Sequence, residues 1–122
     1  MSVYLPPDWP AEVFPPGSED FEASAVASQL NVLPPDYRRH PVLRRYPATL
    51  AAVARHHAQV CVEGARRCYR TARAELEVSL PPHAVDGALA AYRKEGLALA
   101  ATARSVELVE RAVRGQMFAP KL

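Results

Sequence analysis

The sequence lacks any long apolar run, although 49% of its 122 residues are hydrophobic. A membrane-spanning helix needs about 20 consecutive apolar residues, and no stretch comes near that length. The first residues also lack the basic segment followed by an apolar run that marks a signal peptide. Only two cysteines are present, which suits reduced thiols in a cytoplasm. We therefore expect a soluble, cytoplasmic protein with no membrane partner.

Known catalytic motifs are also missing. The chain has no glycine-rich phosphate loop, no GxSxG, no HExxH and no CxxC. Lysine is scarce, because arginine supplies 13 of the 15 basic residues, and isoleucine is absent while alanine occurs 22 times. This bias is typical of a GC-rich bacterial genome, so the abundance of arginine is not in itself a functional signal. We expect no catalytic residues, no enzymatic activity and no cofactor.

Proline is absent from two long windows of the chain. None of the 12 prolines lies between residues 48 and 80 or between 83 and 119, and proline inside a helix costs about 3 kcal/mol. In both windows apolar residues recur at three-and-four spacing, as on one face of an α-helix. The sequence therefore predicts an all-α fold with long helices at 47–79 and 82–114. Their short connection makes them an antiparallel helical hairpin.

The first part of the chain predicts shorter elements. Residues 1–17 form a proline-rich N-terminal arm, whose apolar side chains should lie in a groove of this chain or of a partner. A single helical domain then covers residues 18–122. It begins with a helix at 18–33, capped by Ser18, and residues 35–46 predict short helical turns.

Two glycines are expected to face each other across the hairpin. Counting outward from a turn near residue 80 places Gly64 opposite Gly96. We expect the helices to approach closely there and to leave a notch, with Gly64, Cys68, Tyr92 and Gly96 as candidate binding residues. Apolar rows remain on the outer faces, with Val62, Tyr69 and Leu76 on one helix and Leu97, Leu108 and Ala112 on the other. They predict a homodimer in which two hairpins form a four-helix bundle.

The stretch ARHHAQVCVEGARRCYRTAR, residues 54–73, combines histidine, cysteine and arginine. His57 and Cys61 are four residues apart and share a helix face, as two ligands of one metal ion would. Cys68 lies two turns further on, and the facing segment of the second helix offers no third ligand. A metal site at His57 and Cys61 would need a second chain, so a packing role is the simpler interpretation.

A basic stripe follows on the same helix, formed by Arg66, Arg70 and Arg73. Such a stripe can follow the phosphates of a nucleic acid. The net charge is only +2, however, and Glu63, Glu75 and Glu77 lie close by in the sequence. These acids favour a solvent-exposed helix whose arginines form ion pairs with neighbouring glutamates. Nucleic-acid binding is therefore the weaker interpretation.

Three functions remain open. The leading hypothesis is a non-catalytic helical interaction or regulatory module that contacts an unidentified protein partner. The first alternative is a small-ligand or metal-sensing regulator that uses the Gly64/Gly96 notch with His57 and Cys61. The second alternative is an arginine-rich nucleic-acid-associated protein.

Overall fold

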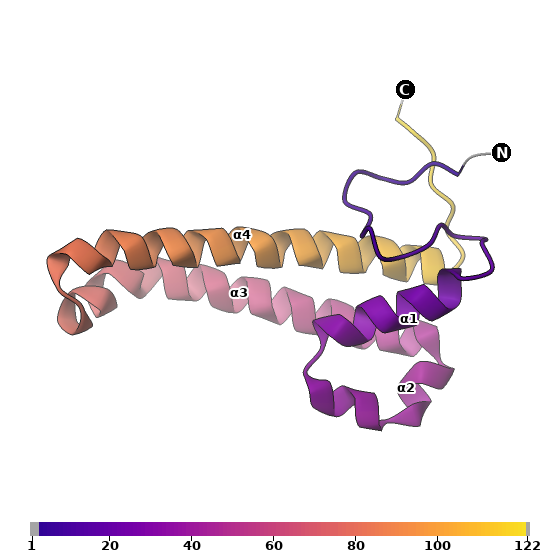
Figure 1. The fold of residues 1–122 in the computed structure, drawn as a ribbon, viewed down its shortest axis with the longest axis horizontal. Helices are drawn as coiled ribbons and strands as arrows, with labels where there is room; N and C mark the ends of the chain where they lie inside the picture. Colours follow the sequence, from indigo (N-terminus) through magenta and orange to yellow (C-terminus); the bar gives the residue numbers. More distant parts are fainter. Residues whose placement is uncertain (1–2, 122) are drawn as a thin grey trace.

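Residues 3–121 are described by a computed structural model, in which every regular element is helical. The elements are α1 (Phe21–Val32), the 3₁₀-helix η1 (Pro35–Arg39), α2 (Pro41–Arg45), α3 (Pro47–Ser79) and α4 (Pro82–Val113). α3 and α4 run antiparallel as a long hairpin, and the short elements gather at one of its ends (Figure 1). The predicted all-α hairpin is thus confirmed.

Local signals in the sequence set the ends of the hairpin helices. A proline occupies the first turn of both α3 and α4, where its missing N–H breaks no helical hydrogen bond. At the end of α4, Gly115 has a positive φ of 101°. Its N–H donates to the Ala112 carbonyl at 2.9 Å, and the Gln116 N–H donates to the Arg111 carbonyl at 3.0 Å. These two bonds are a Schellman motif, so Gly115 ends the helix.

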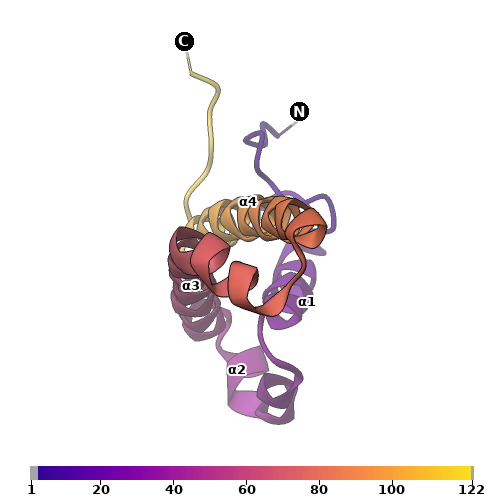
Figure 2. The same ribbon diagram turned by 90° about the vertical axis from the view of Figure 1, so that its left-hand side faces the viewer.

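The larger hydrophobic core lies at the base of the hairpin. There α1 and α2 pack against the first half of α3, and Tyr37 of η1 packs against the same cluster. Leu50 and Ala54 of α3 are fully shielded from solvent, and they cluster with Leu30, Leu33 and Val106. Figure 2, a view along the hairpin, shows α1 beside both long helices and α2 farther from α4.

Beyond this base the hairpin is a two-helix projection. No residue of α3 is buried between Ala58 and Ala72, and none of α4 between Val85 and Val106. Figure 1 shows α3 and α4 continuing together past the end of α1. Because two helices alone cannot enclose a core, side chains along their flanks stay open to solvent.

The proline-rich arm docks on its own chain, which was one of the two arrangements that the sequence left open. Trp9 stacks on Phe21 of α1 with ring centroids 6.3 Å apart. The Trp9 indole N–H donates to the carbonyl of Val13 at 2.8 Å, and Val13 is buried. Asp8 forms an ion pair with Arg104 of α4 at 3.3 Å. The arm therefore ties α1 to the last turns of α4.

The start of α1 differs from the prediction. The helix begins at Phe21, and Asp20 stands at the N-cap without a side-chain hydrogen bond. The hydroxyl of Ser18, the predicted cap, donates instead to the Pro15 carbonyl at 2.6 Å. Ser18 closes a turn that includes Gly17 at a positive φ of 86°, and this turn delays the helix by three residues.

Candidate functional site

An open groove lies between α3 and α4 within the two-helix projection. Its volume is about 440 Å³. We term it the mid-hairpin groove, and its lining residues are Val62, Ala65, Arg66, Tyr69, Arg70, Tyr92, Arg93, Gly96, Leu97 and Ala100. The half-buried members are small or aliphatic and form a floor, whereas the exposed members are aromatic, arginine or leucine and form a rim.

Helical spacing brings these residues to one side of the hairpin. Val62, Arg66 and Tyr69 recur at intervals of four and three on α3, and Arg93, Gly96 and Ala100 do so on α4. On the floor, a Cβ built at Gly96 would lie 3.8 Å from the Cβ of Ala65. That distance is ordinary van der Waals contact, so the helices are close but do not require a glycine here.

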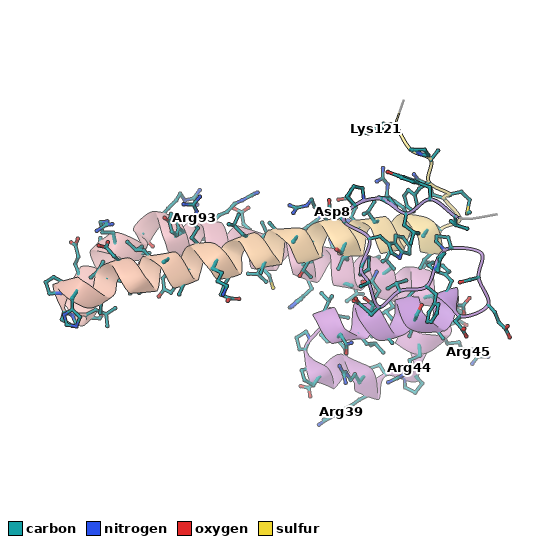
Figure 3. The ribbon with its side chains drawn as sticks, turned by 45° about the horizontal axis from the view of Figure 1, so that its top comes forward. Asp8, Arg39, Arg44, Arg45, Arg93 and Lys121 are labelled. Atoms are coloured by element: carbon teal, nitrogen blue, oxygen red, sulfur yellow. The ribbon has the colours of Figure 1, made fainter. Side chains whose placement is uncertain are left out.

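The rim of the groove is positively charged. Arg66 and Arg70 border it from α3, and Arg93 borders it from α4. Figure 3 shows Arg93 on the projection, away from the base. Within residues 3–121, none of these three arginines takes part in an ion pair. Arg73, the third member of the predicted stripe, pairs with Asp86 at 3.3 Å. The expected ion pairs with glutamates are therefore wrong for all three members of the stripe, since Arg66 and Arg70 form none and the partner of Arg73 is an aspartate.

The predicted notch is only half present. Tyr92 and Gly96 line the mid-hairpin groove, but Gly64 and Cys68 are exposed and do not. A Cβ at Gly64 would meet no atom within 4 Å, whereas the one at Gly96 would meet Ala65. The predicted facing of the two glycines is therefore wrong, and Cys68, a predicted notch residue, lies outside the groove. The ligand-sensing alternative loses the notch on which it rested.

His57 and Cys61 do lie together. The Cys61 sulfur is 3.5 Å from Nε2 of His57, and both line a separate cavity of about 340 Å³. Glu12 from the arm and Ser28 from α1 line the same cavity, so it lies at the base and not in the projection. In the described part of the chain, no group of three or more histidine, cysteine, aspartate or glutamate side chains could hold a metal ion.

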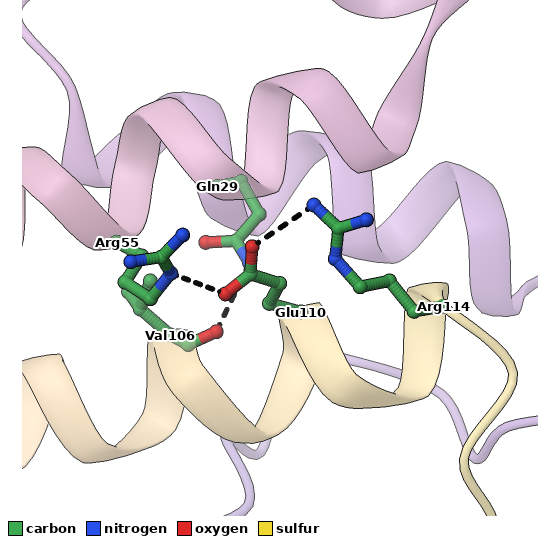
Figure 4. Close-up of polar contacts among 5 residues, drawn as sticks. All are labelled: Gln29, Arg55, Val106, Glu110 and Arg114. Atoms are coloured by element: carbon green, nitrogen blue, oxygen red, sulfur yellow. Dashed lines mark hydrogen bonds and ion pairs between the residues drawn. The ribbon is translucent and has the colours of Figure 1, made fainter.

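A buried ionic cluster at the base was not predicted (Figure 4). Glu110 of α4 accepts from Arg55 of α3 at 2.6 Å and from Arg114 at 3.3 Å, and its side chain is only 8% exposed. Nearby, the Gln29 side-chain amide donates to the Val106 carbonyl at 3.4 Å. The acid-first spacing of Glu110 and Arg114 indicated an ion pair, but nothing local indicated that Arg55 would complete it.

The lining of the groove combines apolar surface with cationic groups. Its described lining supplies apolar surface, two phenols and three guanidinium groups, and it includes no carboxylate, imidazole or thiol. A surface that is both apolar and anionic would complement these groups.

Comparisons with known proteins found no match among protein-family models, curated proteins or solved structures. None of the helices described in residues 3–121 is long and apolar enough to cross a membrane.

Proposed function

We propose that the protein is a non-catalytic interaction module that binds a protein partner through the mid-hairpin groove. The observation that carries this proposal is the exposure of large apolar side chains around the groove floor. Leu97 is 62% exposed and Tyr69 is 45% exposed. Apolar surface gathered in an open groove, rather than scattered singly, is typical of a site that a partner covers.

The composition of the groove also supports a protein partner. Tyrosine and arginine are enriched among the residues that dominate binding at protein interfaces, and the rim has two tyrosines and three arginines. Full burial of a leucine side chain stabilises a complex by about 1.5–3 kcal/mol. The energetic gain from covering Leu97 alone is therefore substantial.

The hydrophobic core at the base fixes the two helices that form the groove. The last buried residue at the base of α3 is Ala58, one helical turn before Val62 at the start of the groove. The core beneath α1 holds both long helices near this point, because Ala58 of α3 and Val106 of α4 belong to one buried cluster. A groove on fixed helices loses little conformational entropy when a partner binds.

A homodimer is one form of this proposal. Of the apolar rows that suggested a four-helix bundle, Val62, Tyr69 and Leu97 line the groove, whereas Ala112 is buried within the chain. A second hairpin laid on the groove would complete a four-helix bundle. Sedimentation at tens of micromolar tests this form, and a monomer at that concentration would contradict it.

The general proposal is tested by size-exclusion chromatography of fresh extracts of the cells that make the protein. The elution of the tagged wild-type chain is compared with that of tagged variants. Wild-type chain should elute in a complex larger than itself, and Leu97→Asp should elute as the free chain because a charge enters the groove. Val60→Asp is the matched control, since Val60 is 69% exposed on α3 close to the groove but does not line it. Free elution of the wild-type chain, or equal effects of both variants, would contradict the proposal.

A further inference from the structure

The size of the mid-hairpin groove constrains its occupant. The lining residues run from Val62 to Arg70 on α3 and from Tyr92 to Ala100 on α4. Eight residues of α-helix rise about 12 Å, so the groove accommodates about two turns of a third helix laid along the hairpin. Docking of an amphipathic helix in an apolar groove is a common recognition mode, with anchors spaced three and four residues apart.

The positive charge of the rim favours a partner that is negatively charged. Arg66 and Arg70 lie on the α3 side of the rim and Arg93 lies on the α4 side. All three are exposed. None is neutralised by an ion pair in the described part of the chain. A helix with carboxylates on both flanks of its apolar face would meet a guanidinium on either side, in the charge-assisted geometry that arginine favours.

A second copy of this chain fits the rim less well. In a two-fold dimer the same patch lies on both sides of the interface. The cations Arg66, Arg70 and Arg93 of one copy would then approach the same cations of the other. Like charges brought together at an interface are strongly unfavourable, whereas an acidic helix turns the same three groups into attractive contacts.

A nucleic-acid strand also fits less well. Proteins that bind single strands follow the backbone along an extended basic surface. Here the basic stripe ends with the groove, because Arg73 on the next turn is paired with Asp86. The floor is aliphatic, with Val62 and Ala65 from α3 and Ala100 from α4, which suits leucine-like anchors better than phosphates.

We infer that the mid-hairpin groove binds an acidic amphipathic helix of a partner protein. The inference rests on the proposed function and names the chemistry of the partner. Apolar side chains at positions i, i+3 or i+4, and i+7 of that helix pack on Ala65, Gly96 and Leu97. Glutamates or aspartates flanking them pair with Arg70 on one side and Arg93 on the other.

The test measures binding of two synthetic peptides to the full-length protein by fluorescence anisotropy. Both are fluorescein-labelled helices of about 14 residues, a length of about 21 Å, with the same leucine anchors. One carries glutamate on both flanks of the leucines and the other carries lysine. The glutamate peptide should bind at least about tenfold more tightly than the lysine peptide, and this preference should shrink as salt is raised.

Single substitutions in the protein then locate the binding. Arg70→Ala and Arg93→Ala should each weaken binding of the glutamate peptide by about threefold to tenfold, and Leu97→Ala by about tenfold. The matched control is Arg67→Ala, because Arg67 is exposed on α3 but does not line the groove. Its effect should stay below about twofold. The double variant Arg70→Glu/Arg93→Glu should prefer the lysine peptide, which a damaged fold would not produce.

Four results would overturn the inference. The first is equal binding of the two peptides or no binding of either, and the second is an effect of Arg67→Ala as large as that of Arg70→Ala. The third is self-association that Leu97→Ala abolishes, which would make a second copy the occupant and leave the proposed function standing. Tight binding of a single-stranded oligonucleotide that Arg70→Ala abolishes would overturn both the inference and the proposed function.

Discussion

Glu110 places a negative charge inside the base of the hairpin. Its carboxylate accepts from Arg55 and from Arg114, and the side chain of Arg55 is itself only 31% exposed. A buried carboxylate is costly unless it is paired and hydrogen-bonded. The two arginines therefore allow a charged residue to join α3 to α4 at the point where α1 covers them.

We predict that Glu110→Gln lowers the free energy of unfolding by about 1–3 kcal/mol, because it leaves the half-buried Arg55 without a counter-charge. Urea denaturation measures the change. Glu107→Gln is the control, since Glu107 is exposed on the same helix and forms no ion pair within residues 3–121; its effect should stay within about 0.5 kcal/mol. Equal effects of the two substitutions would contradict the structural role of Glu110.

The two cysteines should differ in reactivity. Cys68 is exposed, whereas Cys61 is half-buried beside His57, and access to solvent controls thiol modification. We predict that maleimide modifies Cys68 several times faster than Cys61 in the folded protein. Intact-mass measurements on Cys61→Ser and Cys68→Ser would give the two rates. Faster modification of Cys61 would show that the cavity at the base opens or that His57 activates the thiol.

At the scale of the helices, two glycines provide a test of the packing between α3 and α4. Gly64→Ala and Gly96→Ala should each raise the free energy of unfolding by about 1 kcal/mol, because alanine has the higher helix propensity. At Gly96 the new Cβ would meet Ala65 at 3.8 Å, and at Gly64 it would meet nothing. Only Gly96→Ala should also weaken binding of the acidic peptide, since it fills part of the groove floor. Destabilisation by Gly96→Ala in denaturation curves would show that the helices approach more closely than the structure indicates.

The bounds of the long helices were predictable from the sequence, but their facing residues were not. Prolines and Gly115 act locally, so α3 begins and ends where the pattern predicted, and α4 ends within one residue of it. Facing pairs depend on the register of the hairpin, and one residue on a helix turns a side chain by about 100°. Gly96 meets Ala65 and not Gly64, and that shift of one residue removed the predicted notch.

Other parts of the site depend on contacts that are distant in the sequence. Arg55 reaches Glu110 across 55 positions, and no periodicity indicates such a pair. Arg66 and Arg70 were identified as a stripe, but Arg93 was not. The groove needs both helices in place, so it could be recognised only once the hairpin was known.

At the scale of the whole molecule, stability and recognition lie in different places. The base contains the buried leucines, and the projection carries the open groove. We predict that Leu50→Ala, at a position with no exposure, lowers the free energy of unfolding by about 2–5 kcal/mol. Leu97→Ala should change it by no more than about 0.5 kcal/mol. Thermal or urea unfolding would compare them, and a similar loss for both would mean that Leu97 belongs to the core rather than to a binding surface.

The central claim is that the mid-hairpin groove is the surface that a partner covers. Its most direct test is crosslinking in the living cell from a photoreactive amino acid placed at position 97, compared with the same amino acid at position 60. Both positions are exposed on the hairpin, and only position 97 lines the groove. The account predicts a discrete crosslinked protein from position 97, lost on Arg70→Glu, and none from position 60. Identical crosslinks from both positions, or none from position 97, would contradict it.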